Sequence, residues 1–362
     1  MAKSAKYLLI GSTEAYSGKS ATILGVAHQL QSKGLDIAYG KPLGTYRSTN
    51  QLEAMEDDVR FMKEVLNLPE AKLLPPLLSL DAETIEKRLR GEDSSNYRQS
   101  LQDYLRQLSS DLILLEGPGT LCEGGLFNLS LLEVAQEISA PILLVARYHS
   151  VLLVETLLAA KQHLGDYLVG ALINDIPADQ LSTAESTMRP FLERQGIPVM
   201  GMWPRSQLLR SVSVRELVHQ LKAEVLCRAD RLDLMVETLT IGAMNVNSAL
   251  KYFRKGNNMA VVTGGDRADI QMAALETSTH CLILTGHLPP QPFILNRAEE
   301  LEIPVLSVDL DTLTTVEIID HAFGQVRLQE PIKVQCIKQL MGEYFDIERL
   351  INQLGLEPAV TA

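Results

Sequence analysis

The sequence YLLIGSTEAYSGKS, residues 7–20, joins a short apolar strand to a turn that ends in Gly-Lys-Ser. After the turn, apolar residues recur at helical spacing as far as Leu30, and Gly34 follows where the helix would end. Strand, turn and helix in this order are typical of a phosphate-binding loop, in which backbone N–H groups and the positive helix end hold anionic oxygens. We expect Lys19 to contact the β- and γ-phosphates and the Ser20 hydroxyl to bind Mg²⁺.

The loop departs in one respect from the usual G-x-x-x-x-G-K-[ST] pattern. Thr13, not glycine, lies five residues before Gly18, and Gly11 lies two residues earlier still. A Gly-Lys-Ser tripeptide can also be a chance feature of a helix N-terminus, which is the alternative interpretation. The apolar strand before the turn and the helical pattern after it favour the phosphate loop.

The length of the chain, 362 residues, predicts two globular domains. Its formal net charge of −12 disfavours nucleic acid and anionic membrane surfaces as partners. The four cysteines form no C-x-x-C pair, which argues against a disulfide framework and a zinc site and favours a reducing cytoplasm. No apolar run approaches the ~18 residues of a membrane span, and the N-terminal run is too short for a signal peptide.

Further apolar segments without polar alternation predict more buried strands in the first part of the chain. They are IAYGKPLG (37–44), DLILLEGPGT (111–120), APILLVAR (140–147), YLVGALINDIP (167–177) and IPVMGMWP (197–204). Helical stretches separate them, and repeated strand–helix units of this kind predict a parallel sheet with right-handed crossovers and helices on both faces.

Polar residues at the carboxyl ends of these strands form the candidate site, because open parallel sheets bind ligands at that edge. Lys41 follows the second strand and is either a ligand contact or an exposed lysine before a turn proline. Glu116 ends the run LILL, where a carboxylate of the Walker-B type holds the metal. Asn174 ends the fifth strand, where its amide either reads an adenine edge or shapes a turn.

Two further groups are less distinctive. Asp57 and Asp58 lie in the amphipathic segment LEAMEDDVRFMKEVLNL, either on a solvated helix face or as water-mediated holders of Mg²⁺. Arg147 and His149 follow the fourth strand, and we interpret them as loop residues.

A change of pattern near residue 214 marks the predicted domain boundary. The segments MAVVTGGDRADI, HCLILTGHLPP and IPVLSVD predict three strands, separated by helices over 268–276 and 292–301. The Thr-Gly turns after the first two strands are either a second anion site or glycines that serve turn geometry. We therefore predict domains over 1–213 and 214–330, then a helical appendage and small-residue tail over 331–362.

Several of these motifs resemble known families. YLLIGSTEAYSGKSA, GKPLG, the helix with two aspartates, LLEGPGT and LVGALIND resemble the dethiobiotin-synthetase-like branch of the P-loop fold, which includes cobyrinate a,c-diamide synthase. TGGDRADI, with IGAMNVNSAL before it, resembles the DRTGG domain. The pairing is similar to the N-terminal portion of long bacterial phosphotransacetylases, and we expect a chain of this kind without the acetyl-transferring domain.

The resemblance implies an α/β P-loop NTPase fold, with helices on both faces of a parallel sheet, followed by a smaller α/β DRTGG domain. It also implies a site for ATP and Mg²⁺. The implied nucleotide contacts are Gly18, Lys19, Ser20, Ala21 and Asn174. The implied metal ligands are Ser20, Asp58 and Glu116, and the implied catalytic lysines are Lys19 and Lys41. The loop is one residue longer between its glycines than in dethiobiotin synthetase, and Gly-Pro-Gly-Thr replaces Gly-Ala-Gly-Gly after the carboxylate.

Three functions are compatible with this site. The leading hypothesis is an Mg-ATP-binding regulator or sensor of central metabolism, with slow hydrolysis left open, because the nucleotide residues are intact while the substrate side is altered. The second is a ligase that activates a carboxylate by phosphorylation, and the third is a degenerate scaffold or interaction protein. A protein partner is left open.

We further expect self-association through the second block and the C-terminal helices, over residues 214–345, since domains resembling DRTGG commonly pair with themselves. Truncation after Val212 would then leave a nucleotide-binding monomer.

Overall fold

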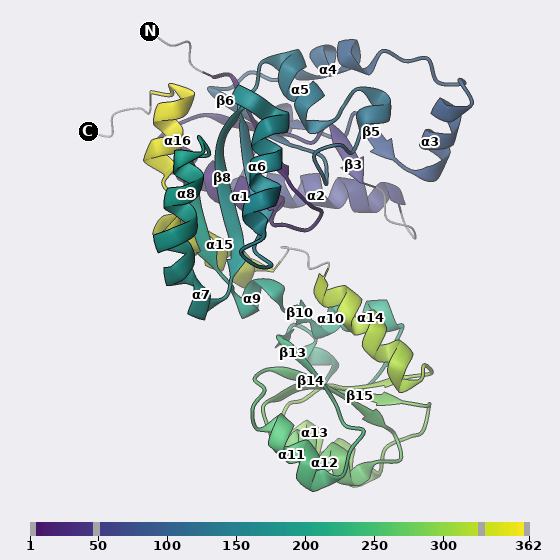
Figure 1. The fold of residues 1–362 in the computed structure, drawn as a ribbon. Coiled ribbons are helices and arrows are strands. Elements are labelled where there is room, and N and C mark those ends of the chain that lie inside the picture. The colour runs from purple at the N-terminus through teal and green to yellow at the C-terminus, as the bar shows by residue number, and fades with distance from the viewer. Residues whose placement is uncertain (1–4, 46–50, 325–329, 358–362) are drawn as a thin grey trace. The chain divides into compact units, whose positions relative to one another are not determined.

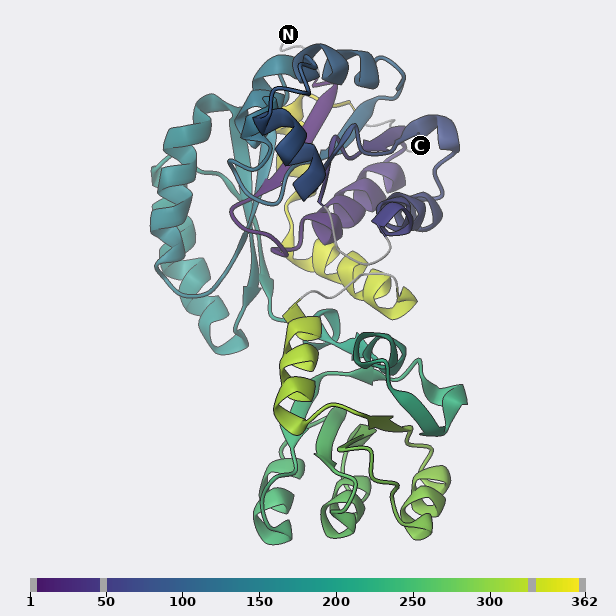
Figure 2. The same cartoon turned by 90° about the vertical axis from the view of Figure 1, so that its right-hand side faces the viewer.

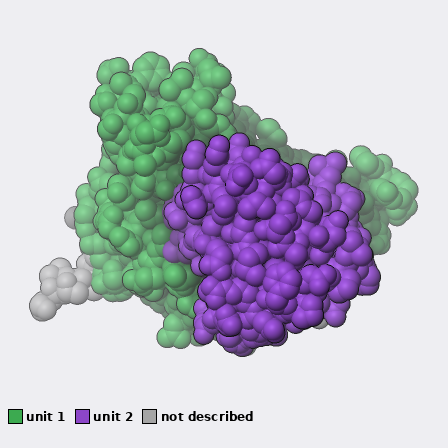
Figure 3. All heavy atoms as spheres, turned by 90° about the horizontal axis from the view of Figure 1, so that it is seen from below, with its two compact units in different colours: residues 1–205, 328–362 green, residues 206–327 purple. Residues whose placement is uncertain are grey.

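The computed structural model describes residues 5–45, 51–324 and 330–357. The chain forms two compact units, one of residues 1–205 with 328–362 and one of residues 206–327 (Figure 3). The second unit is therefore an insertion in the sequence of the first. This boundary lies eight residues before the predicted one, and the C-terminal helices, which are predicted as a separate appendage, belong to the first unit.

A seven-stranded parallel sheet forms the centre of the first unit, in the order β4-β2-β6-β1-β7-β8-β9. The strands are β1 (Tyr7–Ser12), β2 (Ile37–Gly40), β4 (Leu73–Leu74), β6 (Leu112–Glu116), β7 (Ile142–Arg147), β8 (Leu168–Ile176) and β9 (Val199–Pro204). A small parallel pair, β3 (Leu43–Thr45) and β5 (Leu78–Leu80), lies beside it. The predicted parallel α/β fold is confirmed. The prediction succeeds because strands covered on both faces require apolar runs without polar alternation.

Helices cover both faces of this sheet (Figures 1 and 2). The helices are α1 (Lys19–Ser32), α2 (Gln51–Leu66), α3 (Ala82–Leu89), α4 (Tyr97–Leu105), α5 (Leu131–Ile138), α6 (Leu153–Leu164), α7 (Ala178–Thr183), α8 (Arg189–Arg194), α15 (Pro331–Tyr344) and α16 (Ile347–Leu354). One core joins α4, α5, α6 and α8 to one face of the sheet. None of the described helices is long and apolar enough to cross a membrane.

The C-terminal helices belong to the first unit. Figure 2 shows α15 beside α1, and the two are so close that a Cβ on Gly25 would lie 2.4 Å from the Met341 methyl carbon. Arg349 of α16 donates two hydrogen bonds of 2.7 Å to the Glu193 carboxylate of α8. Most apolar side chains of the two helices, among them Ile337, Met341 and Leu350, are buried here, so they are not available to the self-association contact expected from the sequence.

The second unit contains a five-stranded sheet in the order β11-β16-β15-β14-β13, parallel except for β11. Its strands are β11 (Glu224–Cys227), β13 (Thr238–Ile241), β14 (Met259–Gly264), β15 (Thr279–Thr285) and β16 (Val305–Val308). Its helices are α9 (Gln207–Arg210), α10 (Val214–Leu221), α11 (Val246–Phe253), α12 (Ala268–Leu275), α13 (Pro292–Glu300) and α14 (Thr312–Gly324), and β10 (Val212–Ser213) pairs with β12 (Met235–Val236). Helices α11 to α13 pack on one face, and α10 and α14 on the other.

The three predicted strands of this unit are present as β14, β15 and β16. The strands β11 and β13 are not among the predicted ones. They lie at the two edges of the sheet and are only partly buried, so neither carries a continuous apolar run. At the first Thr-Gly turn the packing requires glycine, since a Cβ on Gly265 would lie 2.1 Å from the Leu288 carbonyl oxygen.

Candidate nucleotide-binding site

The loop between β1 and α1 reaches the helix through Gly18, whose φ of 105° is left-handed. A Cβ at this position would lie 2.5 Å from Asn174 Nδ2, so both the backbone angle and the close approach require glycine. Ala21 is buried in the first turn of α1. The loop therefore brings the backbone close to the carboxyl end of β8 at the start of the helix.

Asn174 holds the loop against β8. Its Nδ2 donates to the Ser17 carbonyl at 2.9 Å, and its Oδ1 accepts from the Asp175 backbone N–H at 2.8 Å. An amide has two N–H groups and two lone pairs, so one of each is left beyond these contacts. Recognition of adenine by Asn174 stays a prediction. The structure shows in addition that this side chain positions the loop through the Ser17 carbonyl.

Lys19 is held inside the loop. Its Nζ donates to Ser12 Oγ at 3.0 Å, and Ser12 Oγ in turn donates to the Gly119 carbonyl at 3.0 Å. Burial lowers the pKa of the Lys19 ammonium, and the Glu116 carboxylate partly offsets this effect. A phosphate that binds to Lys19 would therefore replace an internal hydroxyl contact.

Glu116 is the buried acid at the centre of the site, with 5% of its surface exposed. Its Oε1 accepts from Ser20 Oγ at 3.2 Å and lies 3.7 Å from Lys41 Nζ. Its Oε2 accepts from the Tyr39 hydroxyl at 2.8 Å. The structure thus brings the predicted Ser20, Lys41 and Glu116 together, although Tyr39 was not predicted.

A second acid, Glu123, lies close to Lys19. Its Oε2 accepts from the Gly119 N–H, and its charge raises the pKa of Lys19 slightly against the effect of burial. Two lysines, Lys19 and Lys41, thus lie near two carboxylates, Glu116 and Glu123, and their ionised charges cancel. An anionic nucleotide gains the most favourable electrostatic energy in such a site when it binds together with a cation.

The residues fit a phosphate and a magnesium ion. The Ser17 hydroxyl in the loop is 1% exposed and has no hydrogen-bond partner in the described part of the protein, so a phosphate oxygen could satisfy it. Ser20 and Glu116 supply the oxygen ligands that Mg²⁺ prefers, and Mg²⁺ in nucleotide sites takes only one or two protein oxygens besides phosphates and water. Among the described residues, no cluster of three His, Cys, Asp or Glu side chains could hold a metal ion.

The remaining predicted residues lie around this centre or outside it. The backbone of Asp58 belongs to α2, but its side chain, like that of Asp57, lies outside the described residues. His149 Nε2 lies 2.7 Å from Glu14 Oε1 of the loop. Arg147 donates to the Asp175 carboxylate at 3.0 Å and thereby fixes the end of β8.

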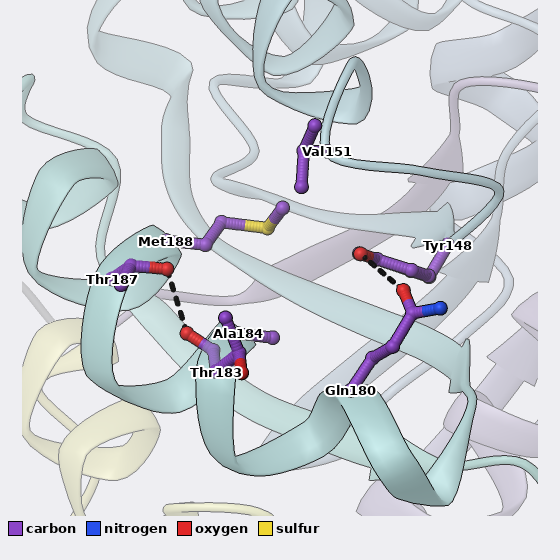
Figure 4. Close-up of a pocket in the computed structure, with 7 residues that line it drawn as sticks. All are labelled: Tyr148, Val151, Gln180, Thr183, Ala184, Thr187 and Met188. Carbon is purple, nitrogen blue, oxygen red and sulfur yellow. Dashed lines mark hydrogen bonds between the residues drawn. The ribbon is translucent and has the colours of Figure 1, made fainter.

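A separate cavity of 240 Å³ lies beyond the ends of β7 and β8 (Figure 4). Its lining residues are Tyr148, Val151, Gln180, Thr183, Ala184, Thr187 and Met188. The Tyr148 hydroxyl donates to Gln180 Oε1 at 2.8 Å, and a π-helical turn, Ala184–Met188, forms one wall. None of the predicted site residues lines this cavity, which therefore lies apart from the phosphate loop.

The sheet order, the glycine turn and the cluster around Glu116 define a P-loop protein. In agreement, the AAA domain family matches residues 6–213, and the DRTGG domain matches residues 216–322. The chain belongs to the AAA domain family, in its dethiobiotin-synthetase-like P-loop form, and carries a DRTGG domain.

Curated proteins similar to this chain over most of its length include phosphate acetyltransferases. Those of Synechocystis sp. and of Nitratidesulfovibrio vulgaris are each 25% identical to this chain over 96% of its length and 51% of theirs. The chain thus spans about half the length of the curated relatives it matches. Among solved structures, the CBS and DRTGG domains of a Clostridium perfringens pyrophosphatase, in complex with the activator diadenosine tetraphosphate, share 21% identity. That likeness has a TM-score of 0.29 and covers 48% of this chain and 86% of the other.

Proposed function

We propose that this chain binds Mg-ATP at the phosphate loop and acts as a regulator or sensor in central metabolism. The proposal is carried by the cluster of Lys19 and Ser20 at the start of α1 with Glu116 at the end of β6. In this cluster Ser20 Oγ lies 3.2 Å from Glu116 Oε1. Similarity to the N-terminal half of phosphate acetyltransferases supports a place in metabolism.

Each residue has a role in this proposal. Lys19 turns from Ser12 to the β- and γ-phosphates, and the loop N–H groups bind the same oxygens. Ser20 and Glu116 hold Mg²⁺, which when bound neutralises phosphate charge, and Asp58 contributes through water. Asn174 contacts adenine with the donor and acceptor that its loop contacts leave over.

One observation favours the carboxylate-activating ligase as a second candidate. Lys41 is 9% exposed and lies 3.7 Å from Glu116, so its ammonium is beside the proposed metal and phosphate position. A lysine there could stabilise charge on a transferred phosphoryl group. In this reading an organic carboxylate would bind at the Gly117–Thr120 turn.

Titration of ATP, ADP and GTP by calorimetry, with and without Mg²⁺, followed by an assay of phosphate release, separates these functions. Tight Mg-ATP binding with negligible turnover supports the regulator. Turnover that depends on an added carboxylate supports the ligase. No binding of any nucleotide would contradict both and leave the scaffold.

Glu116→Gln is expected to remove the magnesium dependence of ATP binding. Glutamine keeps the size of the side chain but removes the charge that the metal requires, and it also relieves repulsion between the carboxylate and the phosphates. Without Mg²⁺, ATP should bind the variant at least as tightly as it binds the wild type, and added Mg²⁺ should change the affinity little. Calorimetry in EDTA and in Mg²⁺ measures both affinities.

The matched control is Glu155→Gln, which removes an exposed acid from α6. It should keep the wild-type response to Mg²⁺. An unaltered response in Glu116→Gln would instead move the metal role to Asp57 or Asp58.

We also propose that the second unit mediates self-association, within residues 214–324. Large apolar side chains are exposed on it, including Tyr252 at 58%, Phe293 at 52% and Leu313 at 68%. The net charge of −12 supports partners other than nucleic acid or membranes. Sedimentation of residues 207–327, which have cores of their own, should show a dimer or larger closed oligomer, and a monomer would contradict this interface.

A further inference from the structure

The carboxylate of Glu116 is held from two sides. Ser20 at the start of α1 binds one oxygen, and Tyr39 of β2 binds the other. Tyr39 is in register with Leu114, two residues before Glu116 on the neighbouring strand. Side chains two residues apart on a strand share a face, so the sheet itself places the tyrosine hydroxyl beside the carboxylate.

These two contacts respond differently to a bound metal ion. As a metal ligand, Ser20 would present an oxygen lone pair to the cation, so the geometry of the hydrogen bond that it now donates to Glu116 depends on the loop and on the metal. The Tyr39 hydroxyl is fully buried in the sheet, and its contact of 2.8 Å does not involve the loop. It can therefore hold the carboxylate whatever position Ser20 takes.

Lys41 cannot replace this contact. Its Nζ lies 3.7 Å from Glu116 Oε1, which is beyond hydrogen-bond distance, so the ion pair attracts the carboxylate without fixing its orientation. A phenol hydroxyl bonded to an ionised acid is directional and stronger than a neutral hydrogen bond.

We propose that Tyr39 is a positioning residue, which keeps the Glu116 carboxylate aimed at the metal while the phosphate loop and Ser20 adjust to the bound nucleotide and cation. This inference rests on the proposed Mg-ATP site. It assigns a role to a residue that the sequence presents as one more apolar core position.

The test is Tyr39→Phe, which removes only the hydroxyl. Binding of a fluorescent ATP analogue is titrated with Mg²⁺, and we expect the half-saturating Mg²⁺ concentration to rise about tenfold, the loss of one charge-assisted hydrogen bond. Affinity for the analogue in EDTA should stay at the wild-type value, because Tyr39 does not touch the phosphate loop contacts. Tyr148→Phe is the matched control, since it removes a buried phenol hydroxyl with a bond of the same 2.8 Å, to Gln180, and should leave the Mg²⁺ titration unchanged.

A double-mutant cycle separates positioning from general damage to the fold. If Tyr39 acts through the carboxylate, Tyr39→Phe should lower the affinity for the analogue at a fixed, subsaturating Mg²⁺ concentration in the wild type but not in the Glu116→Gln background. An equal loss of affinity in both backgrounds, or a wild-type Mg²⁺ titration of Tyr39→Phe, would overturn the role of Tyr39 while the nucleotide site stands. A wild-type protein that binds no analogue at any Mg²⁺ concentration would instead overturn the proposed function, and this inference with it.

Discussion

Lys19→Ala is expected to abolish Mg-ATP binding and to leave the protein folded. The ammonium is the one loop group that carries a full positive charge to the phosphates, so its loss should weaken binding by about a hundredfold or more. Stability should change little, because the amine donates its hydrogen bond to the neutral Ser12 hydroxyl, and burial, which has the largest effect on its pKa, disfavours the charged form more than Glu116 and Glu123 favour it. Calorimetry measures the affinity, and thermal unfolding measures the stability.

The control for this variant lies at the other end of the same helix. Lys33 pairs with Glu348 at the surface, and such exposed pairs contribute about 0–1 kcal/mol, so Lys33→Ala should keep both nucleotide affinity and fold. Mg-ATP affinity unchanged in Lys19→Ala would show that the loop does not bind phosphate.

Much of the first unit could be predicted because its chemistry is local in the sequence. Because the strands are buried on both faces, each is a continuous apolar run, such as Leu112–Leu115, which is recognisable in the sequence. The phosphate loop combines strand, glycine and lysine within a few residues. Glu116 could be predicted for the same reason, since the first polar residue after a buried parallel strand lies at the edge of the sheet where ligands bind.

The contacts that complete the site could not be predicted, because they join residues distant in sequence and of ordinary type. Tyr39 is a buried aromatic in a strand and gives no sign that its hydroxyl meets Glu116, 77 residues away. Glu123 follows a glycine turn whose path the sequence does not reveal. The sequence predicts that Asn174 either contacts adenine or shapes a turn, whereas its bond to the Ser17 carbonyl depends on how the loop folds.

The C-terminal helices present a different difficulty. The helix α16 is strongly amphipathic, with Leu350, Ile351 and Leu354 on its buried side, which shows that it packs but not on what. Because the two helices follow the second unit in the sequence, they are predicted to pack on that unit. The chain instead returns to the first unit, where α15 packs on α1, the helix that begins with Lys19.

Removal of residues 328–362 is therefore expected to unfold the first unit, contrary to the expectation that truncation after Val212 leaves a nucleotide-binding monomer. The truncation exposes α1 and β9 and removes buried apolar side chains. These are Ile337, Met341, Leu350, Ile351 and Leu354. At roughly 1.5–3 kcal/mol for each, their loss is comparable with the ~5–15 kcal/mol by which a whole domain is stable.

The matched variant removes residues 207–327 and joins the ends by a flexible glycine–serine linker. It keeps α15 and α16, so it should fold cooperatively and bind Mg-ATP with wild-type affinity, whereas the C-terminal truncation should be degraded rapidly by protease and bind none. Circular dichroism, limited proteolysis and calorimetry compare the two. If the truncated protein stayed folded and kept its nucleotide affinity, the two helices would be an appendage after all, and the first unit would be complete at β9.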